Sequence, residues 1–180
     1  MKRRLLIASG IAGVLLVVVA IAVASPNITA CKGVFSRTSF VFAPACYQAA
    51  GAARAYYRHL AAGAFVDAAR YVAYYETFSD VAPTTPPAQL RQQWVQRVSA
   101  LQAQGTYVAQ IHSVEVMLED GYPVGVATVT IHQQGQEWTI TQHIHFMDVE
   151  GWKVQAVVSP GGETALDYAV SGHIDPHLDQ

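Results

Sequence analysis

The sequence predicts an α+β domain in which three helices are followed by an antiparallel meander of four strands. Apolar residues recur at helical spacing between residues 46 and 104. From Thr106 the spacing changes to two, which is typical of strands with one buried face. Short connections that contain glycine separate the alternating runs, and connections this short join antiparallel neighbours.

In front of this domain, residues 1–24 predict one transmembrane or signal helix. Lys2, Arg3 and Arg4 precede an uncharged, apolar run over residues 5–24. About twenty apolar residues are enough to cross a bilayer core of ~30 Å as a helix. Because positive charges stay on the cytoplasmic side, the rest of the chain is expected outside the cytoplasm.

Three interpretations of this segment remain open. Its length favours a retained single-pass anchor in the cell membrane. Residues 22–24 form an Ala-Val-Ala site, so cleavage after Ala24 would give a secreted protein. Residues 28–31, Ile-Thr-Ala-Cys, resemble a bacterial lipobox, and lipidation at Cys31 would give a lipoprotein.

The chain contains two cysteines, Cys31 and Cys46, whose spacing does not match a C-x-x-C motif. Outside the cytoplasm they are candidates for a disulfide that closes a short loop. Cys31 cannot be both lipidated and disulfide-bonded. Residues 25–45, which contain both glycine and proline, are interpreted as a spacer.

The helical part is expected to contain three helices. The first begins near residue 46 and ends before Gly63, and the second runs from Phe65 to about residue 78. Pro87 suits the first turn of a third helix, which Gly105 ends. Its apolar positions are spaced by four, four and three residues and form one face: Leu90, Trp94, Val98 and Leu101.

Four strands are expected over residues 107–118, 122–133, 137–149 and 152–158. Gly121, Gly135 and Gly151 lie between them in positions that suit tight turns. The folded domain is therefore assigned to residues 46–158, and residues 159–180 are interpreted as a less ordered C-terminal tail.

The charge distribution argues against a nucleic-acid partner. The formal net charge is -2, and three of the 11 basic residues lie before the apolar run. The remainder carries eight basic and 13 acidic residues, a net charge of -5. Phosphate contacts dominate nucleic-acid affinity, and this domain lacks the basic clusters that make them.

Two passages carry a resemblance to a known family. Residues 53–69, Ala-Arg-Ala-Tyr-Tyr-Arg-His-Leu-Ala-Ala-Gly-Ala-Phe-Val-Asp-Ala-Ala, place a small-residue turn between two helices, and residues 151–154, Gly-Trp-Lys-Val, open the last strand. Together with the element order, they resemble the nuclear transport factor two-like superfamily (ketosteroid isomerase and polyketide cyclase-like) over residues 46–158.

This resemblance implies a curved sheet that wraps the helices into a cone with an internal pocket. It does not imply one activity, because the superfamily includes isomerases, polyketide cyclases, dehydratases, transport adaptors and non-catalytic modules. Some members are held by one N-terminal span, including assembly components of type IV secretion systems. Many relatives dimerise through the open sheet face.

Four residues are candidates for the pocket: Tyr57, Tyr74, Trp94 and Glu115. The ketosteroid-isomerase-like members combine an acidic base with a hydrogen-bond-donating tyrosine in an apolar pocket. Tyrosines are abundant here, but Asp80 and Glu115 are the only acids weighed as a base, and a solvated or capping carboxylate is the simpler interpretation of both. No catalytic residue is assigned.

His143 and His145 are weak candidates for metal ligands. They lie two apart in a strand and so share a face, opposite Trp138, Ile140, Ile144 and Phe146, which we expect to be buried. A catalytic zinc site needs a third ligand, which His112 or His132 would have to supply. Exposed histidines are the simpler interpretation, and no metal or cofactor is predicted.

The hypothesis favoured by the sequence is a membrane-tethered extracytoplasmic binding or assembly module without catalytic activity. The apolar segment and the shortage of acids at strand positions motivate it. The alternative is a small-molecule isomerase or cyclase-like enzyme that uses an acid and tyrosines in the cone pocket, so the question of catalysis stays open. A homodimer or a protein partner on the sheet face is a further expectation.

Overall fold

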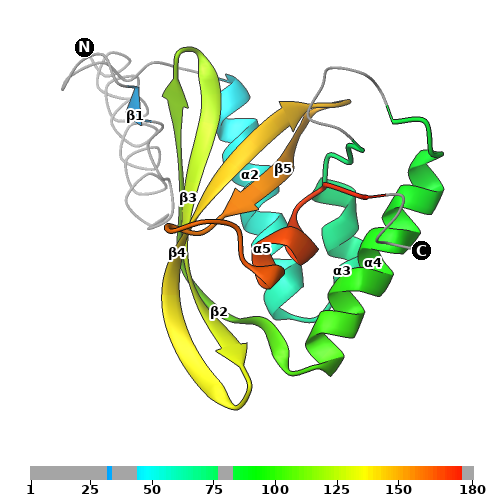
Figure 1. Ribbon diagram of the computed structural model, residues 1–180. Helices are drawn as coiled ribbons and strands as arrows, with labels where there is room; N and C mark the ends of the chain where they lie inside the picture. Colours follow the sequence, from blue (N-terminus) through cyan, green and yellow to red (C-terminus); the bar gives the residue numbers. More distant parts are fainter. Residues whose placement is uncertain (1–31, 34–43, 77–82, 176–180) are drawn as a thin grey trace, which may run out of the picture. The chain divides into compact units, whose positions relative to one another are not determined.

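A computed structural model describes residues 32–33, 44–76 and 83–175 of the chain (Figure 1). The chain divides into two compact units, Met1–Ala30 and Cys31–Gln180, and all described residues belong to the second. Among the described residues, no helix is both long and apolar enough to cross a membrane. The predicted segment over residues 5–24 lies outside them.

The first predicted helix is α2, Pro44–Ala61, and it packs against β2, β5 and β3. Alanines on its buried side let the helix approach the sheet closely, while Tyr56, Tyr57 and Leu60 fill the space further along. Arg58 and His59 lie in the last turn, where positive charge favours the helix dipole. Gly63 ends the segment at φ 67°, a conformation that favours glycine.

The second predicted helix is much shorter than expected. It consists of α3, Phe65–Ala68, and one 3-10 turn, η1, Ala69–Tyr71. Val72 is already extended and forms a parallel bridge with Val154, and the Ala73 N–H donates to the Val154 carbonyl at 2.8 Å. The apolar stripe therefore continues as a sheet-edge segment, because pairing with β5 outweighs the local helical pattern.

The third predicted helix is confirmed as α4, Pro87–Ala103. Three residues of the predicted face, Leu90, Trp94 and Val98, are buried, and Leu101 is partly buried against the core. The helix packs against β2 and against α5, Ala165–Val170, which the sequence analysis did not predict.

The four-stranded antiparallel meander is confirmed nearly residue for residue. Its strands are β2, Thr106–Glu119; β3, Tyr122–Gln133; β4, Gln136–Asp148; and β5, Trp152–Val158. The first two hairpins turn through Asp120-Gly121 and Gln134-Gly135, all four residues at positive φ, as a type I′ turn requires. A short strand, β1, Lys32–Gly33, adds parallel to β2 at Met117 and Leu118.

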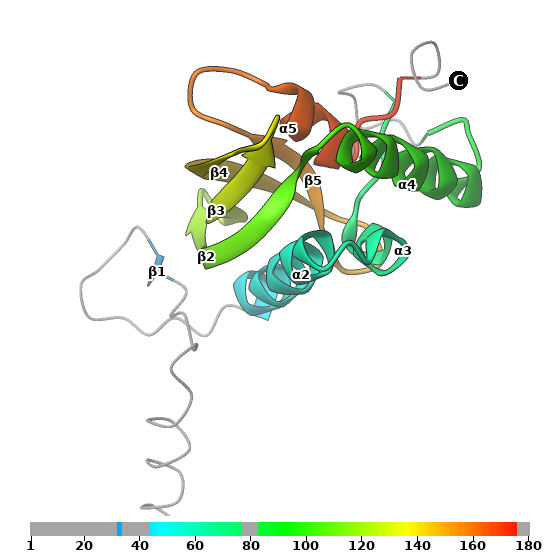
Figure 2. The same cartoon turned by 90° about the horizontal axis from the view of Figure 1, so that it is seen from below.

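The helices α2 and α4 lie on the same side of the sheet (Figures 1 and 2), which leaves the sheet with a core face and an outer face. On β3, Ala127 and Val129 point into the core and are fully buried. Trp138 was expected to be buried but is 53% exposed. It lies next to the turn between β3 and β4, near the tip of that hairpin.

Residues 159–175 are folded, in contrast to the loose tail expected from residue 159 onward. After β5 the chain makes an exposed loop, enters α5 and continues to residue 175 (Figure 1). Leu166, Val170 and Ile174 join the main hydrophobic core. Three large apolar side chains recur every four residues, which explains why this short segment stays on the domain.

Candidate functional site

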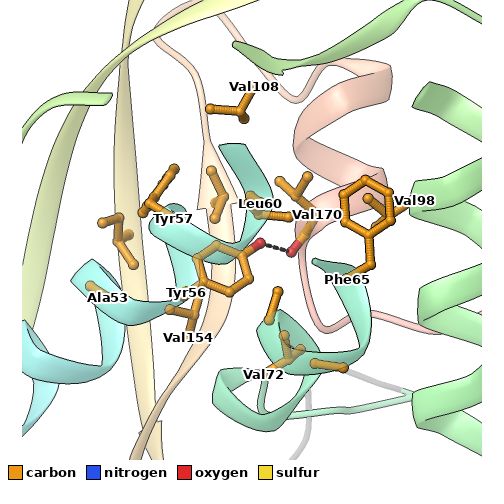
Figure 3. Packing of buried hydrophobic residues seen from close by; sticks show 14 of the residues in the cluster. Ala53, Tyr56, Tyr57, Leu60, Phe65, Val72, Val98, Val108, Val154 and Val170 are labelled. Carbon is orange, nitrogen blue, oxygen red and sulfur yellow. Dashed lines mark hydrogen bonds between the residues drawn. The ribbon is translucent and has the colours of Figure 1, made fainter. Parts of the chain in front are cut away.

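The centre of the core contains a polar network beneath the C-terminal segment. Figure 3 shows Tyr56 and Tyr57 of α2 among apolar side chains, with the Tyr56 hydroxyl directed at the Val170 carbonyl. Both tyrosines are fully buried, and their rings meet edge to face at a centroid distance of 5.2 Å. The fold thus buries two tyrosine hydroxyls in the interior of the domain.

Asp167 of α5 is a fully buried carboxylate that accepts hydrogen bonds on both oxygens. Its Oδ1 accepts from Gln142 Nε2 at 2.7 Å and from Ser159 Oγ at 2.9 Å. Its Oδ2 accepts from the Ser159 N–H at 3.1 Å, the Thr164 N–H at 3.0 Å and the Thr164 hydroxyl at 2.8 Å. These donors satisfy a group that would otherwise be costly to bury.

Thr164 and Asp167 also form a capping box at the start of α5. The Thr164 hydroxyl accepts from the Asp167 N–H at 3.1 Å, while the carboxylate bonds the Thr164 N–H. This arrangement satisfies backbone donors that the helix itself cannot pair. The same carboxylate therefore starts the helix and joins it to β4 through Gln142.

Tyr57 is linked to this carboxylate through one glutamine. Its hydroxyl donates to Gln142 Oε1 at 3.1 Å, and Gln142 Nε2 donates to Asp167. Burial raises the pKa of Tyr57 far above its usual value, and the charge of Asp167 raises it further. The Tyr57 hydroxyl therefore stays protonated near neutral pH and keeps the proton that it donates to Gln142.

A second set of contacts holds the residues that follow α5. Arg97 of α4 donates to three backbone carbonyls. Its Nε donates to the Ala169 carbonyl at 3.2 Å, its Nη2 to the Ser171 carbonyl at 2.8 Å and its Nη1 to the His173 carbonyl at 2.6 Å. Trp94 Nε1 donates to the same Ser171 carbonyl at 3.1 Å. A cation at the C-terminal end of a helix also favours the helix dipole.

In this arrangement the Asp167 carboxylate is the acceptor, and the polar groups around it already donate hydrogen bonds to it. Asp167 receives two hydrogen bonds on one oxygen and three on the other. A carboxylate has about four lone-pair sites, so these hydrogen bonds leave no free acceptor position on Asp167 for a substrate. The network suits structural positioning better than general base catalysis.

The structure brings together only some of the predicted pocket residues. Tyr57 and Trp94 are both fully buried in the core, while Tyr74 lies beside it and donates to the Ala69 carbonyl at 2.9 Å. Burial raises the pKa of Tyr74, although Arg91 opposes the shift.

Glu115, one of the two acids considered as a base, does not join these residues. Glu115 is exposed and lies between the buried Val114 and Val116, so it points to the outer face of the sheet, away from the pocket position predicted for it. Asp80 lies outside the described residues.

The outer face carries the paired histidines where the sequence placed them. His143 and His145 are exposed, and Ile144 between them is buried. The histidines weighed as a third ligand have other partners: His112 contacts the Thr130 hydroxyl at 2.8 Å, and His132 contacts the Gly105 carbonyl at 2.9 Å. Within the described ranges, no group of three His, Cys, Asp or Glu side chains could hold a metal ion.

Cys46 in the first turn of α2 is fully buried and disulfide-bonded. Its Sγ lies 3.6 Å from the Val116 carbonyl oxygen, a packing contact because a disulfide sulfur has no proton to donate. Cys31, its predicted partner, lies outside the described residues. The pairing and the alternative of lipidation at Cys31 therefore both stay predictions.

Three residues that organise the interior were not predicted as functional from the sequence: Gln142, Asp167 and Arg97. One signal was present, because Thr164 stands three positions before Asp167, as in a capping box, with apolar residues around it. A second signal was the polar Gln142 on the face of β4 that carries Ile140 and Ile144. No protein-family model, curated protein or solved structure matches this chain significantly, so the geometry carries the functional argument.

Proposed function

We propose that this chain is a membrane-tethered extracytoplasmic binding or assembly module without catalytic activity, built on a cone-like domain of the nuclear transport factor two-like type. Support for the tether comes from the basic residues and the apolar run at the N-terminus. Support for the domain type comes from the element order, with helices on one face of an antiparallel meander.

The observation that carries the non-catalytic part is the state of Asp167. It is the acid next to the buried tyrosines, and five donors already occupy its oxygens. An isomerase of the ketosteroid type needs a carboxylate that exchanges a proton with its substrate. A saturated carboxylate that also caps a helix favours a structural role over the enzymatic alternative.

The outer face of the sheet is the surface proposed for a protein partner. None of the described helices lies on it (Figures 1 and 2). The register places Glu115 opposite Val126 and Val126 opposite His143, which gives a row of charged, apolar and imidazole side chains across three strands. Apolar groups flanked by polar ones are the usual composition of a protein interface.

Site-specific photo-crosslinking in intact cells tests this proposal. A photoreactive benzophenone amino acid at His143 is expected to give a discrete protein adduct, either a second copy of the chain or another protein. The matched control carries the same residue at Gln92, an exposed position on α4. Equal labelling at both positions, or no adduct at His143, would contradict an interface on the outer face.

The tether has its own test, which is the intact mass of the native protein. The proposal predicts the full-length mass in the membrane fraction. Loss of residues 1–24 would indicate a cleaved signal, and an added lipid mass would indicate modification of Cys31; either result would contradict the retained anchor.

A further inference from the structure

Residues 164–175, which we call the strap, are held on the domain as a ligand is held in a site. The strap contains α5 and the extended residues after it. Its residues Leu166, Asp167, Ala169, Val170, Ser171 and Ile174 are all buried. Residues 160–163, which precede the strap, and Thr164, its first residue, are exposed. The strap is therefore joined to β5 by a solvent-facing loop.

The side chains that hold the strap share one chemistry, because each of them donates hydrogen bonds to it. Tyr56, Trp94 and Arg97 donate to its backbone carbonyls. Gln142 and Ser159 donate to its carboxylate at Asp167. The side chains under the strap are therefore donors, and the two at Asp167 form a site that is suited to a carboxylate.

The rest of the site is apolar. Leu166, Val170 and Ile174 of the strap join the same core cluster as Leu90, Trp94 and other buried residues of the helices and sheet. Removing the strap would uncover these partners together with the donors. An occupant that replaced it would need an apolar body and a carboxylate, as the strap itself has.

The loop before the strap contains two glycines, whose backbone can change conformation when the strap leaves the domain. Gly161 and Gly162 both have positive φ, 101° and 121°, and a Cβ at either would have no atom within 4 Å. Neither glycine is packed against the domain. The segment after β5 is thus held on the domain through Ser159 and the strap residues, and not through these two glycines.

We propose that the strap is a displaceable segment that occupies, in cis, a binding site for a small apolar carboxylate. The ligand carboxylate takes the place of the Asp167 carboxylate at Gln142 and Ser159, and its apolar body takes the place of Leu166 and Val170. This inference rests on the proposed binding function and gives it a ligand class. It does not depend on the outer face, so the two proposals fail in different experiments.

Hydrogen exchange of the full-length protein tests whether the strap is a separable unit. The Gly172 N–H donates to the Gln155 carbonyl and the Ile174 N–H to the Tyr75 carbonyl, so both report on release of the strap. Both amides are expected to exchange at least about tenfold faster than Val129 at the centre of β3, because a local opening costs less than global unfolding. Exchange of all three at the same rate would overturn the proposal.

Octanoate tests the ligand class, with octylammonium and octanol as probes of the same chain length. Octanoate is expected to accelerate exchange at Gly172 and Ile174 saturably, by about tenfold, because a ligand that binds the open state shifts the population toward it. Octylammonium and octanol are expected to leave the rates unchanged. No response to octanoate, or the same response to all three probes, would overturn the proposal.

Variants of Gln142 separate ligand recognition from simple loosening. Gln142→Leu removes the amide that donates to the Asp167 carboxylate, so the strap amides are expected to exchange faster without ligand and to respond at least about tenfold more weakly to octanoate. Gln142→Asn, which keeps the amide on a shorter side chain, serves if the leucine variant does not fold, and its response is expected to lie between those of the wild type and the leucine variant. An unchanged octanoate response in the folded variant would contradict the carboxylate position proposed at Gln142.

Discussion

Replacement of Asp167 by asparagine is the perturbation whose cost can be worked out most fully from the structure. The aspartate accepts two hydrogen bonds on Oδ1 and three on Oδ2 in a fully buried position. Asparagine has nearly the same shape but offers one oxygen and one NH₂ group, so one set of donors must face another donor.

Neither orientation of the asparagine satisfies all of its neighbours. An NH₂ group at the Oδ2 position faces the backbone N–H groups of Ser159 and Thr164, which cannot rotate away. An NH₂ group at the Oδ1 position requires the Gln142 amide to flip, and the flip leaves the buried Tyr57 O–H without its acceptor. Each buried unpaired donor costs about 1–3 kcal/mol, so we expect Asp167→Asn to lower the free energy of unfolding by about 3 kcal/mol.

Urea denaturation of the full-length protein measures this loss. The matched control is Asp148→Asn, because the exposed Asp148 carboxylate accepts from the Gly151 N–H at 3.1 Å. The control is expected to change the free energy of unfolding by no more than about 0.5 kcal/mol. If both variants changed it equally little, the reasoning about the buried network would be refuted.

Two further predictions concern the same interior. In Gly172→Ala, the new Cβ would lie 1.9 Å from the Ala73 carbonyl oxygen, so urea denaturation should show a free energy of unfolding lower by about 3 kcal/mol or more. The control Gly51→Ala lies within α2, where a Cβ has no atom within 4 Å, and should raise the free energy of unfolding by up to about 1 kcal/mol. The reverse order would contradict the crossing of backbones at Gly172. Burial raises the pKa of both Tyr56 and Tyr57, so their contribution to stability is complete below pH 10 and falls above it, by about 1.4 kcal/mol per pH unit for each. Tyr57→Phe should therefore reduce the slope of unfolding free energy against pH above pH 10. An unchanged slope would contradict the raised pKa of Tyr57.

Much of the fold could be predicted because its strands follow a simple pattern. In β3, residues such as Ala127 and Val129 alternate with residues on the outer face, and glycines lie at the turns. The period therefore indicated both the strand and the side that is buried. The same reasoning failed at Trp138, because alternation shows which face a residue takes but not how far the helices extend over that face.

The candidate site was less predictable because its contacts join residues far apart in the chain. Gln142 and Asp167 are separated by 25 positions, and Arg97 and Ser171 by 74. Local spacing showed α4 and its apolar stripe, but the partners of Arg97 are backbone carbonyls, whose positions no side-chain pattern reveals. The extended Val72 was missed for a related reason, since its pairing with Val154 is a tertiary contact that overrides local propensity.

The closed interior is the feature on which the proposed function most depends, and in it the Gln142 amide is fully buried between Tyr57 and Asp167. Proton exchange of the Gln142 side-chain NH₂ in the unliganded full-length protein measures this closure, with the exposed Gln136 as the internal reference. We predict exchange at Gln142 to be slower by about a hundredfold or more, because it requires the strap to open. Exchange at the rate of Gln136 would contradict the sealed network and the function proposed from it.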